Sequence, residues 1–161
     1  MPYRLIAVFA LTALSLIAAC ADQQSGEPSA RWQVRGEFSH GDATTRYVAT
    51  YQDTILVAVE EEQNYGDYGL ARTRYEVVDG RLVYYRSDEQ RRVMSEGQTG
   101  DFEEISLELE FDEAGRIRRQ IKLVDGEPTE LVGYEAPGVQ RHFEELKRRA
   151  DLAQGAALGG M

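Results

Sequence analysis

The chain has 161 residues and a formal net charge of −10, from 28 acidic and 18 basic residues. That length suffices for one domain with one modest core. An acidic surface repels phosphate, which argues against nucleic acid as a partner and against peripheral binding to anionic lipid. The single cysteine excludes an internal disulfide and a thiolate metal site.

The first nineteen residues have the layout of a secretory signal peptide. Residues 1–4 (MPYR) supply a free amine and Arg4, and residues 5–19 form an apolar run without charge. Fifteen helical residues span about 22 Å, less than the roughly 30 Å of a bilayer's hydrocarbon core. The pattern therefore favours a removable leader over a permanent membrane span.

The apolar run ends in IAAC, where Ala18 and Ala19 directly precede Cys20, the only cysteine. This resembles the lipobox of bacterial lipoproteins, and the resemblance covers residues 1–20. It implies that residues 1–19 are cut off and that Cys20 is the lipid-attachment site, carrying a diacylglyceryl group and usually a further acyl chain such as palmitate. Two or more chains hold a protein stably on a membrane. The alternative is an incidental cysteine in an ordinary signal or an uncleaved anchor.

The residue after the cysteine bears on localisation. In the family's sorting rule, Asp at that position retains the protein in the inner membrane, but here Ala21 follows and Asp22 comes one residue later. The resemblance therefore implies a protein of the bacterial cell envelope on the inner leaflet of the outer membrane, facing the periplasm.

The mature chain divides into three parts. Residues 20–30, the cysteine and a polar segment with one proline, read as a flexible tether that holds the domain on the order of 18 Å from the lipid. Residues 31–154 form a single β-rich domain with a C-terminal helix. Residues 155–161 (GAALGGM) are expected to be a disordered tail.

Alternating apolar and polar residues predict a mainly β fold, an antiparallel meander of about eight strands that forms a curved sheet or a small barrel. The predicted strands are residues 31–38, 44–51, 54–62, 70–78, 81–87, 102–111, 116–124 and 129–134. Longer connections are expected at 64–69 and 87–101.

Two of these strands have clear inner faces. The strand predicted at 102–111 should bury Ile105, Leu107, Leu109 and Phe111. The strand predicted at 116–124 should bury Ile117, Ile121 and Leu123. Pairing them on that basis sets Arg118, Gln120 and Lys122 on the wet side, with bases opposite Glu108 and Glu110.

Asp79-Gly80 and Asp125-Gly126 predict tight hairpin turns, since both residues of a type I′ turn need positive φ. Across the first turn, Val77 should meet Leu82 and Tyr75 should meet Tyr84.

An amphipathic helix is predicted after Pro137 and Gly138. Its apolar stripe is Val139, Phe143, Leu146, Ala150 and Ala153. The stripe should pack on the sheet or plug a barrel end, with docking into a partner's groove as the alternative. Ion pairs are expected between Glu144 and Arg148 and between Glu145 and Arg149.

The histidines give weak catalytic or metal signals. Ser39, His40 and Asp42 contain the residue types of a hydrolytic triad, but in one short loop they cannot converge on a substrate, so a plain turn is expected. His142 and Glu145 could supply two metal ligands, but a zinc site needs a third, so a solvated helix face is expected.

The segment EEEQNYGDYG gathers Glu60, Glu61, Glu62 and Asp67, which could offer oxygens to calcium but lack the spacing of an EF-hand; a mobile acidic loop is the expectation. Tyr65 and Tyr68 could form a contact surface for sugar or peptide.

The sequence contains no phosphate loop, nucleophile elbow or metal-spaced histidine set, and it names no cofactor, catalytic residue or metal ligand. It predicts a non-catalytic binding module for a small amphipathic ligand or an envelope protein. A cup for cargo predicts an apolar cavity behind Tyr75 and Tyr84, whereas a docking or enzyme-inhibitor module predicts a filled core. An envelope hydrolase remains as a further alternative.

Overall fold

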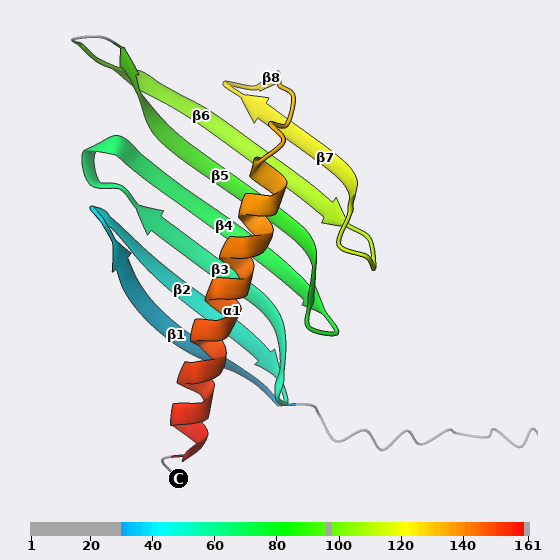
Figure 1. Ribbon diagram of the computed structural model, residues 1–161. Helices are drawn as coiled ribbons and strands as arrows, with labels where there is room; N and C mark the ends of the chain where they lie inside the picture. The colour runs from blue at the N-terminus through cyan, green and yellow to red at the C-terminus, as the bar shows by residue number, and fades with distance from the viewer. Residues whose placement is uncertain (1–29, 96–97, 160–161) are drawn as a thin grey trace, which may run out of the picture.

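A computed structural model describes residues 30–95 and 98–159. Cys20 and the leader therefore lie outside the described residues. The described chain forms one eight-stranded antiparallel sheet in which every strand pairs with the next along the chain. The sheet is open, and one long helix crosses it diagonally (Figure 1).

The strands that make the meander are β1 (Arg31–His40), β2 (Ala43–Gln52), β3 (Ile55–Asn64), β4 (Gly69–Val78), β5 (Arg81–Ser95), β6 (Gln98–Phe111), β7 (Ile117–Val124) and β8 (Glu127–Pro128). A 3-10 turn, η1 (Gly66–Tyr68), joins β3 to β4, and the helix α1 spans Glu135–Gly159. The predicted class, a mainly β meander with a C-terminal helix, is confirmed.

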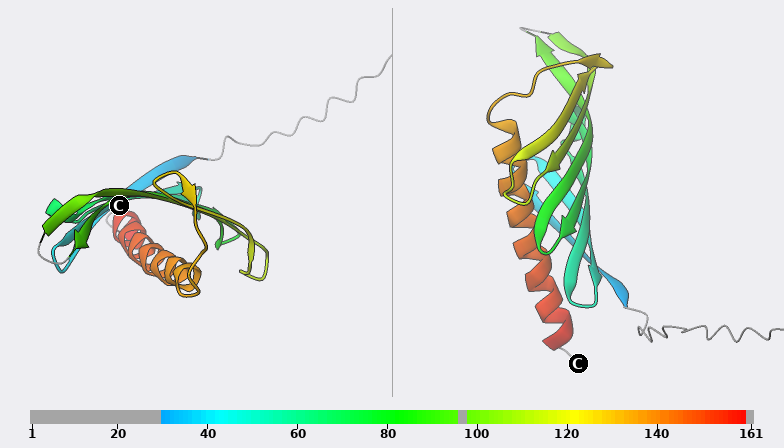
Figure 2. Two further views of the ribbon diagram at one scale, coloured as in Figure 1. Left: turned by 90° about the horizontal axis from the view of Figure 1, so that it is seen from above. Right: turned by 90° about the vertical axis from the view of Figure 1, so that its right-hand side faces the viewer.

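The sheet is curved, and α1 lies on its concave side (Figure 2). The helix buries the predicted stripe against the sheet: Phe143, Leu146 and Ala150 have at most 1% of their surface exposed. Two hydrogen bonds also hold the helix to the rest of the fold. Gln140 Nε2 donates to the Gly115 carbonyl at 2.7 Å, and the Tyr51 hydroxyl donates to the Asp151 carboxylate at 3.0 Å. The helix continues through residues 155–159, which the sequence assigns to a tail.

The two Asp-Gly turns adopt the predicted positive φ, with 51° and 74° at Asp79 and Gly80. Val77 meets Leu82 as predicted, but the tyrosine pairing is wrong by one residue. A β-bulge after Glu76 leaves Val83 as an extra residue, so Tyr75 faces Tyr85 with ring centroids 5.3 Å apart. The bulge turns Tyr85 into the core.

The inner face of β6 is confirmed, because Leu107, Leu109 and Phe111 are buried, but the face assigned to β7 is wrong. Ile121 lies opposite Glu108 and is exposed, while Arg119 binds both Glu108 (3.4 Å) and Glu110 (3.0 Å). A register shift at the end of β6 causes the difference.

Lys122, expected on the wet side of β7, instead reaches the carboxylate of Glu135 in the first turn of α1, at 2.7 Å. This ion pair ties the inner face of β7 to the start of the helix. The predicted pair of Glu145 with Arg149 is confirmed, at 2.7 Å. The predicted partner of Arg148 is wrong, because Arg148 binds Glu145 (2.8 Å) instead of Glu144.

Two further predictions about the strands are wrong: the connection expected at 87–101 and the last strand. β5 and β6 extend far into the connection expected at 87–101, and polar contacts pair them, including Arg91 to Glu103 at 3.0 Å. The predicted last strand, 129–134, is mostly irregular: Glu135 accepts a bond from the Val132 amide (2.6 Å) and turns the chain into α1.

The described part of the chain contains no helix that is both long enough and apolar enough to span a bilayer.

Candidate binding site

Strand alternation divides the acidic run of β3 between the two faces of the sheet. Glu60 and Glu62 point to the convex face, where they pair with Arg74 and Arg72. Glu61 points to the concave face, and its side chain is only 1% exposed. The three carboxylates cannot share one cation, and residues 30–95 and 98–159 hold no cluster suited to a metal.

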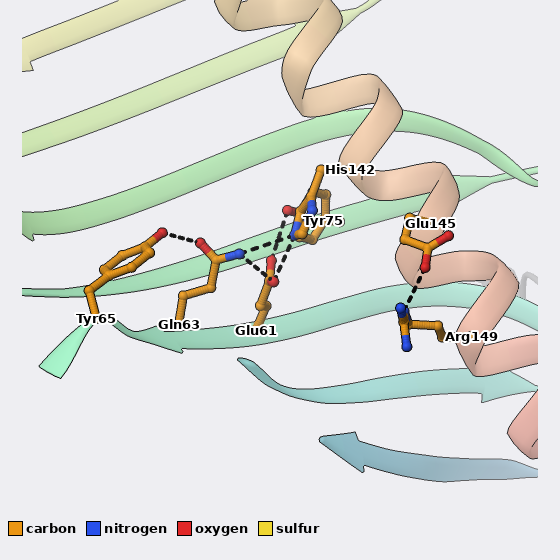
Figure 3. A network of polar contacts seen from close by, with 7 residues as sticks. All are labelled: Glu61, Gln63, Tyr65, Tyr75, His142, Glu145 and Arg149. Atoms are coloured by element: carbon orange, nitrogen blue, oxygen red, sulfur yellow. Dashed lines mark hydrogen bonds and ion pairs between the residues drawn. The ribbon is translucent and has the colours of Figure 1, made fainter. Parts of the chain in front are cut away.

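Three donors surround the carboxylate of Glu61 beneath the helix (Figure 3). His142 Nε2, from α1, donates to Oε1 at 2.7 Å. The Tyr75 hydroxyl, from β4, donates to Oε2 at 3.0 Å, and Gln63 Nε2 donates to Oε1 at 2.9 Å. A buried carboxylate is costly unless it is paired and hydrogen-bonded, and this one has both kinds of partner.

The network perturbs the titration of its own members. The hydrogen bond to Glu61 raises the pKa of His142 against the opposing effect of burial. Burial, with the Glu61 charge second, holds the pKa of the Tyr75 hydroxyl well above its ordinary value. The bond to Glu61 thus favours the protonated imidazole of His142, and burial keeps the Tyr75 phenol neutral.

Gln63 connects this buried centre to the surface. Its Oε1 accepts a hydrogen bond from the Tyr65 hydroxyl, while its Nε2 serves Glu61. Burial, reinforced by the nearby Glu89 and Glu61, raises the pKa of Tyr65 to about 12. Tyr65 therefore stays a neutral donor whose ring forms a wall of the adjoining hollow.

That hollow, here called the notch, has a volume of about 530 Å³. It lies where the β1–β2 turn, η1 and β5 meet, and is lined by His40, Asp42, Ala43, Tyr65, Tyr68, Glu89 and Arg91. Two tyrosines and two carboxylates face one opening. Tyr68 is 54% exposed, although it is a large aromatic side chain.

The loop that carries the two tyrosines has a defined shape. Asn64 Oδ1 accepts a bond from the Gly66 amide (2.8 Å), and the Tyr65 amide bonds to the Gly69 carbonyl (2.9 Å). Gly69 has φ 140°, and a Cβ there would lie 1.9 Å from the Gln90 carbonyl oxygen. Only glycine lets the loop approach β5 this closely. The segment expected as a mobile acidic loop is strand up to Asn64.

The residues considered for a hydrolytic triad or a metal site do not form those sites, although His40 and Asp42 line the notch. Ser39 and His40 end β1 and Asp42 lies in the two-residue turn that follows, as expected of a plain turn. His142 and Glu145 do not act as a ligand pair, since His142 binds Glu61 and Glu145 binds two arginines. The predicted solvated face was wrong for His142, which turns toward the sheet.

Sequence reasoning found Tyr65 and Tyr68 but missed the role of Gln63, Glu89 and Arg91. Period-two alternation in β3 was the available signal: Glu61 and Gln63 share the parity of the buried Val59. Glu89 and Arg91 fell in the segment expected to be a connection.

In comparisons with known proteins, no family model, no curated protein and no solved structure matches this chain.

Proposed function

We propose that this protein is a lipid-anchored lipoprotein of the bacterial envelope, held through Cys20, whose β domain is a non-catalytic docking module. In this proposal an envelope protein is the partner, and the notch receives a segment of it. The observation that supports this best is the pairing of a filled concave face with an open, tyrosine-lined notch at one end.

The filled core favours docking over transport of an apolar cargo. Tyr75, expected to border a cavity, is 2% exposed and stacks on Phe143 with centroids 5.7 Å apart. Leu146 and Ala150 occupy the space that a cargo would need. A cup for an amphipathic small molecule would have to lose these contacts, whereas a docking surface uses the fold as it stands.

The lining of the notch suggests the chemistry of the partner. Tyrosine offers a large contact area at low entropic cost, and carboxylates attract cations. Asp42 and Glu89 line the notch, while the one arginine there, Arg91, is held by Glu103. A loop or extended segment presenting a lysine or arginine side chain would meet both features.

The anchor can be tested separately from the docking. Cells fed radiolabelled palmitate should label the full-length protein, and Cys20→Ser should lose the label and leave the membrane fraction. A Cys20→Ser variant that still fractionates with membrane and keeps its leader would contradict the anchor.

Docking can be tested by crosslinking in intact cells. A photoreactive phenylalanine analogue at Tyr68 should give a discrete adduct with one envelope protein, and the same analogue at Arg74 on the convex face should not. Glu89→Gln combined with Asp42→Asn should reduce the adduct, whereas the matched convex-face pair Glu62→Gln and Asp88→Asn should leave it unchanged.

Equal adducts at Tyr68 and Arg74 would contradict the notch as the docking point. Native mass spectrometry of the purified protein addresses the small-ligand alternative: a bound mass that is lost on denaturation would favour it. An activity abolished by His142→Gln or His40→Gln would favour a hydrolase.

A further inference from the structure

The two ends of the sheet differ in their relation to the anchor. The Ala30 amide donates to Asp53 Oδ1 at 3.1 Å, and the Asp53 amide donates to the Ala30 carbonyl at 2.9 Å. These bonds fix the start of β1 to the β2–β3 turn. The β4–β5 and β6–β7 turns lie at this same end of the sheet, and η1 lies at the opposite end (Figure 1).

The convex face changes character toward the end where β1 begins. Over the middle of the sheet it carries exposed ion pairs, such as Arg72 with Glu62 and Arg74 with Glu60. At the β1 start it carries four aliphatic side chains, here called the aliphatic patch: Ile55, Val57, Val78 and Val83. Ile55 is 57% exposed and Val78 is 53% exposed.

Two β-bulges help to build this patch. Thr50 pairs with Ala58 and Tyr51 with Leu56, which leaves Val57 as the extra residue of β3. Val83 is the extra residue of β5 in the same way. A bulge re-aims a side chain that regular pairing would place elsewhere.

The patch adjoins the point where the chain enters the fold. Val57, Val78 and Val83 line one open hollow of about 540 Å³ together with Arg31 and Trp32, the first residues of β1. Any group attached a short way upstream of Ala30 is therefore held close to this hollow.

We propose that the aliphatic patch rests on the lipid bilayer. This inference depends on the proposed anchor at Cys20, which lies ten positions before Ala30 in the sequence; ten residues span at most about 36 Å even when fully extended. The proposed anchor is thus joined to the β1 start, at the opposite end of the sheet from the notch. Exposed aliphatic side chains at that position gain by entering the apolar boundary of the membrane.

The charges around the patch bear on the kind of lipid. Asp53 and Asp79 lie in the two turns next to the patch. However, Arg31 lines the same hollow and Arg81 lies 3.8 Å from Asp79, so acids and bases around the patch are balanced. A balanced surface has no excess of positive charge that would favour anionic over zwitterionic headgroups. The surface therefore suits zwitterionic lipid. A strand of ten residues is about 33 Å long, so a membrane that meets the sheet at its β1 end leaves the notch, at the opposite end, facing partners in the periplasm.

Trp32, the only tryptophan, reports on this contact. Its ring stacks on Tyr51 with centroids 4.8 Å apart, and its indole nitrogen donates to the Asp53 carbonyl, which places it at the β1 start. The experiment uses the protein expressed with its leader, purified from membranes and reconstituted into phosphatidylcholine vesicles, with or without bromine on the acyl chains near the headgroup. Because interfacial residues sit roughly 5–10 Å into the boundary, brominated lipid should lower Trp32 emission about twofold.

Ile55→Asp combined with Val78→Asp should remove most of that quenching. The matched control is Val93→Asp combined with Phe102→Asp, which changes two exposed apolar residues, 44% and 42% exposed, and should quench like the unmodified protein. Circular dichroism confirms that both double variants keep the β fold.

The intact mass of the purified protein, measured by mass spectrometry, distinguishes a failure of the proposed anchor from a failure of the proposed membrane contact. An acylated protein whose Trp32 emission does not respond to bromine overturns membrane contact while the anchor stands. If the mass shows no lipid, the anchor fails, and the same chain coupled through its single thiol to a maleimide lipid still decides whether the patch meets the bilayer. The inference would also be overturned if the unmodified protein showed no quenching but formed a dimer that Ile55→Asp combined with Val78→Asp abolished. In that case a second copy of the chain, and not lipid, would cover the patch.

Discussion

The concave and convex faces of the sheet are built from alternate residues of the same strands, yet they place the same kind of charged side chain in opposite surroundings. Glu61 is buried on the concave face with three donors, whereas its neighbours Glu60 and Glu62 reach arginines in water on the convex face. One step along the strand changes a solvated charge into a buried one. The side chain is the same, so its surroundings decide its energetic role.

The two faces should therefore contribute differently to the free energy of unfolding. Contacts on the concave face remove apolar surface from water and satisfy buried polar groups, and each such residue contributes several kcal/mol at most. Exposed ion pairs typically contribute about 0–1 kcal/mol because water and salt screen them. Stability should therefore follow the face on which a residue lies, more than its charge or its number of partners.

The largest effect is expected from Phe143→Ala. The ring is 1% exposed and packs against Tyr75, so its removal leaves a cavity between α1 and the sheet. The free energy of unfolding should fall by about 3–5 kcal/mol. Urea unfolding monitored by circular dichroism measures this, with Glu144→Ala, the adjacent exposed residue, as the control. Equal losses for the two variants would show that the helix does not cover the sheet.

A smaller, pH-dependent effect is expected from His142. Glu61 raises its pKa above 6.5, with Glu145 adding to the shift, while Tyr75 and Gln63 complete the set of groups that face the pair. The folded state therefore binds the proton more tightly than the unfolded state. The resulting stability is fully present below about pH 6.5 and is lost as the pH rises through the folded pKa.

Unfolding free energies should accordingly decline between about pH 6 and pH 9, by about 1 kcal/mol or less because His142 is partly exposed. His142→Gln should flatten this slope, and His40→Gln, at the end of β1, should keep it. The upper limit stays below the range in which tyrosines ionise in the unfolded chain. An unchanged slope in His142→Gln would show that the Glu61 bond does not favour the protonated imidazole.

The pattern of the sequence was sufficient for the strands that carry apolar alternation and for the turns that carry Asp-Gly. It failed where tertiary contacts decide. The bulge that pairs Tyr75 with Tyr85, and the register shift that exposes Ile121, are properties of how two strands pair with each other. Local alternation contains no information on an inserted residue, so both errors are shifts in pairing.

The same limit explains the candidate site. Tyr65 and Tyr68 stand out in the sequence because tyrosine in a loop offers a large contact area at low entropic cost. The bond between Glu61 and His142 joins residues 81 positions apart, and neither residue has a local pattern that points to the other. Glu61 could have been assigned to the buried face from the parity of Val59, but its partner required the placement of the helix.

The smallest effect is expected on the convex face, where Arg74→Gln removes two exposed ion pairs at once. Arg74 lies 3.5 Å from Glu60 and 3.0 Å from Glu76, and its side chain is 54% exposed. Two pairs in water should contribute less than about 1 kcal/mol together, and this contribution should shrink as salt is raised. Urea unfolding at low and high ionic strength measures it. A loss as large as that of Phe143→Ala would mean that the convex face is covered rather than solvated, and the contrast between the two faces would then have to be abandoned.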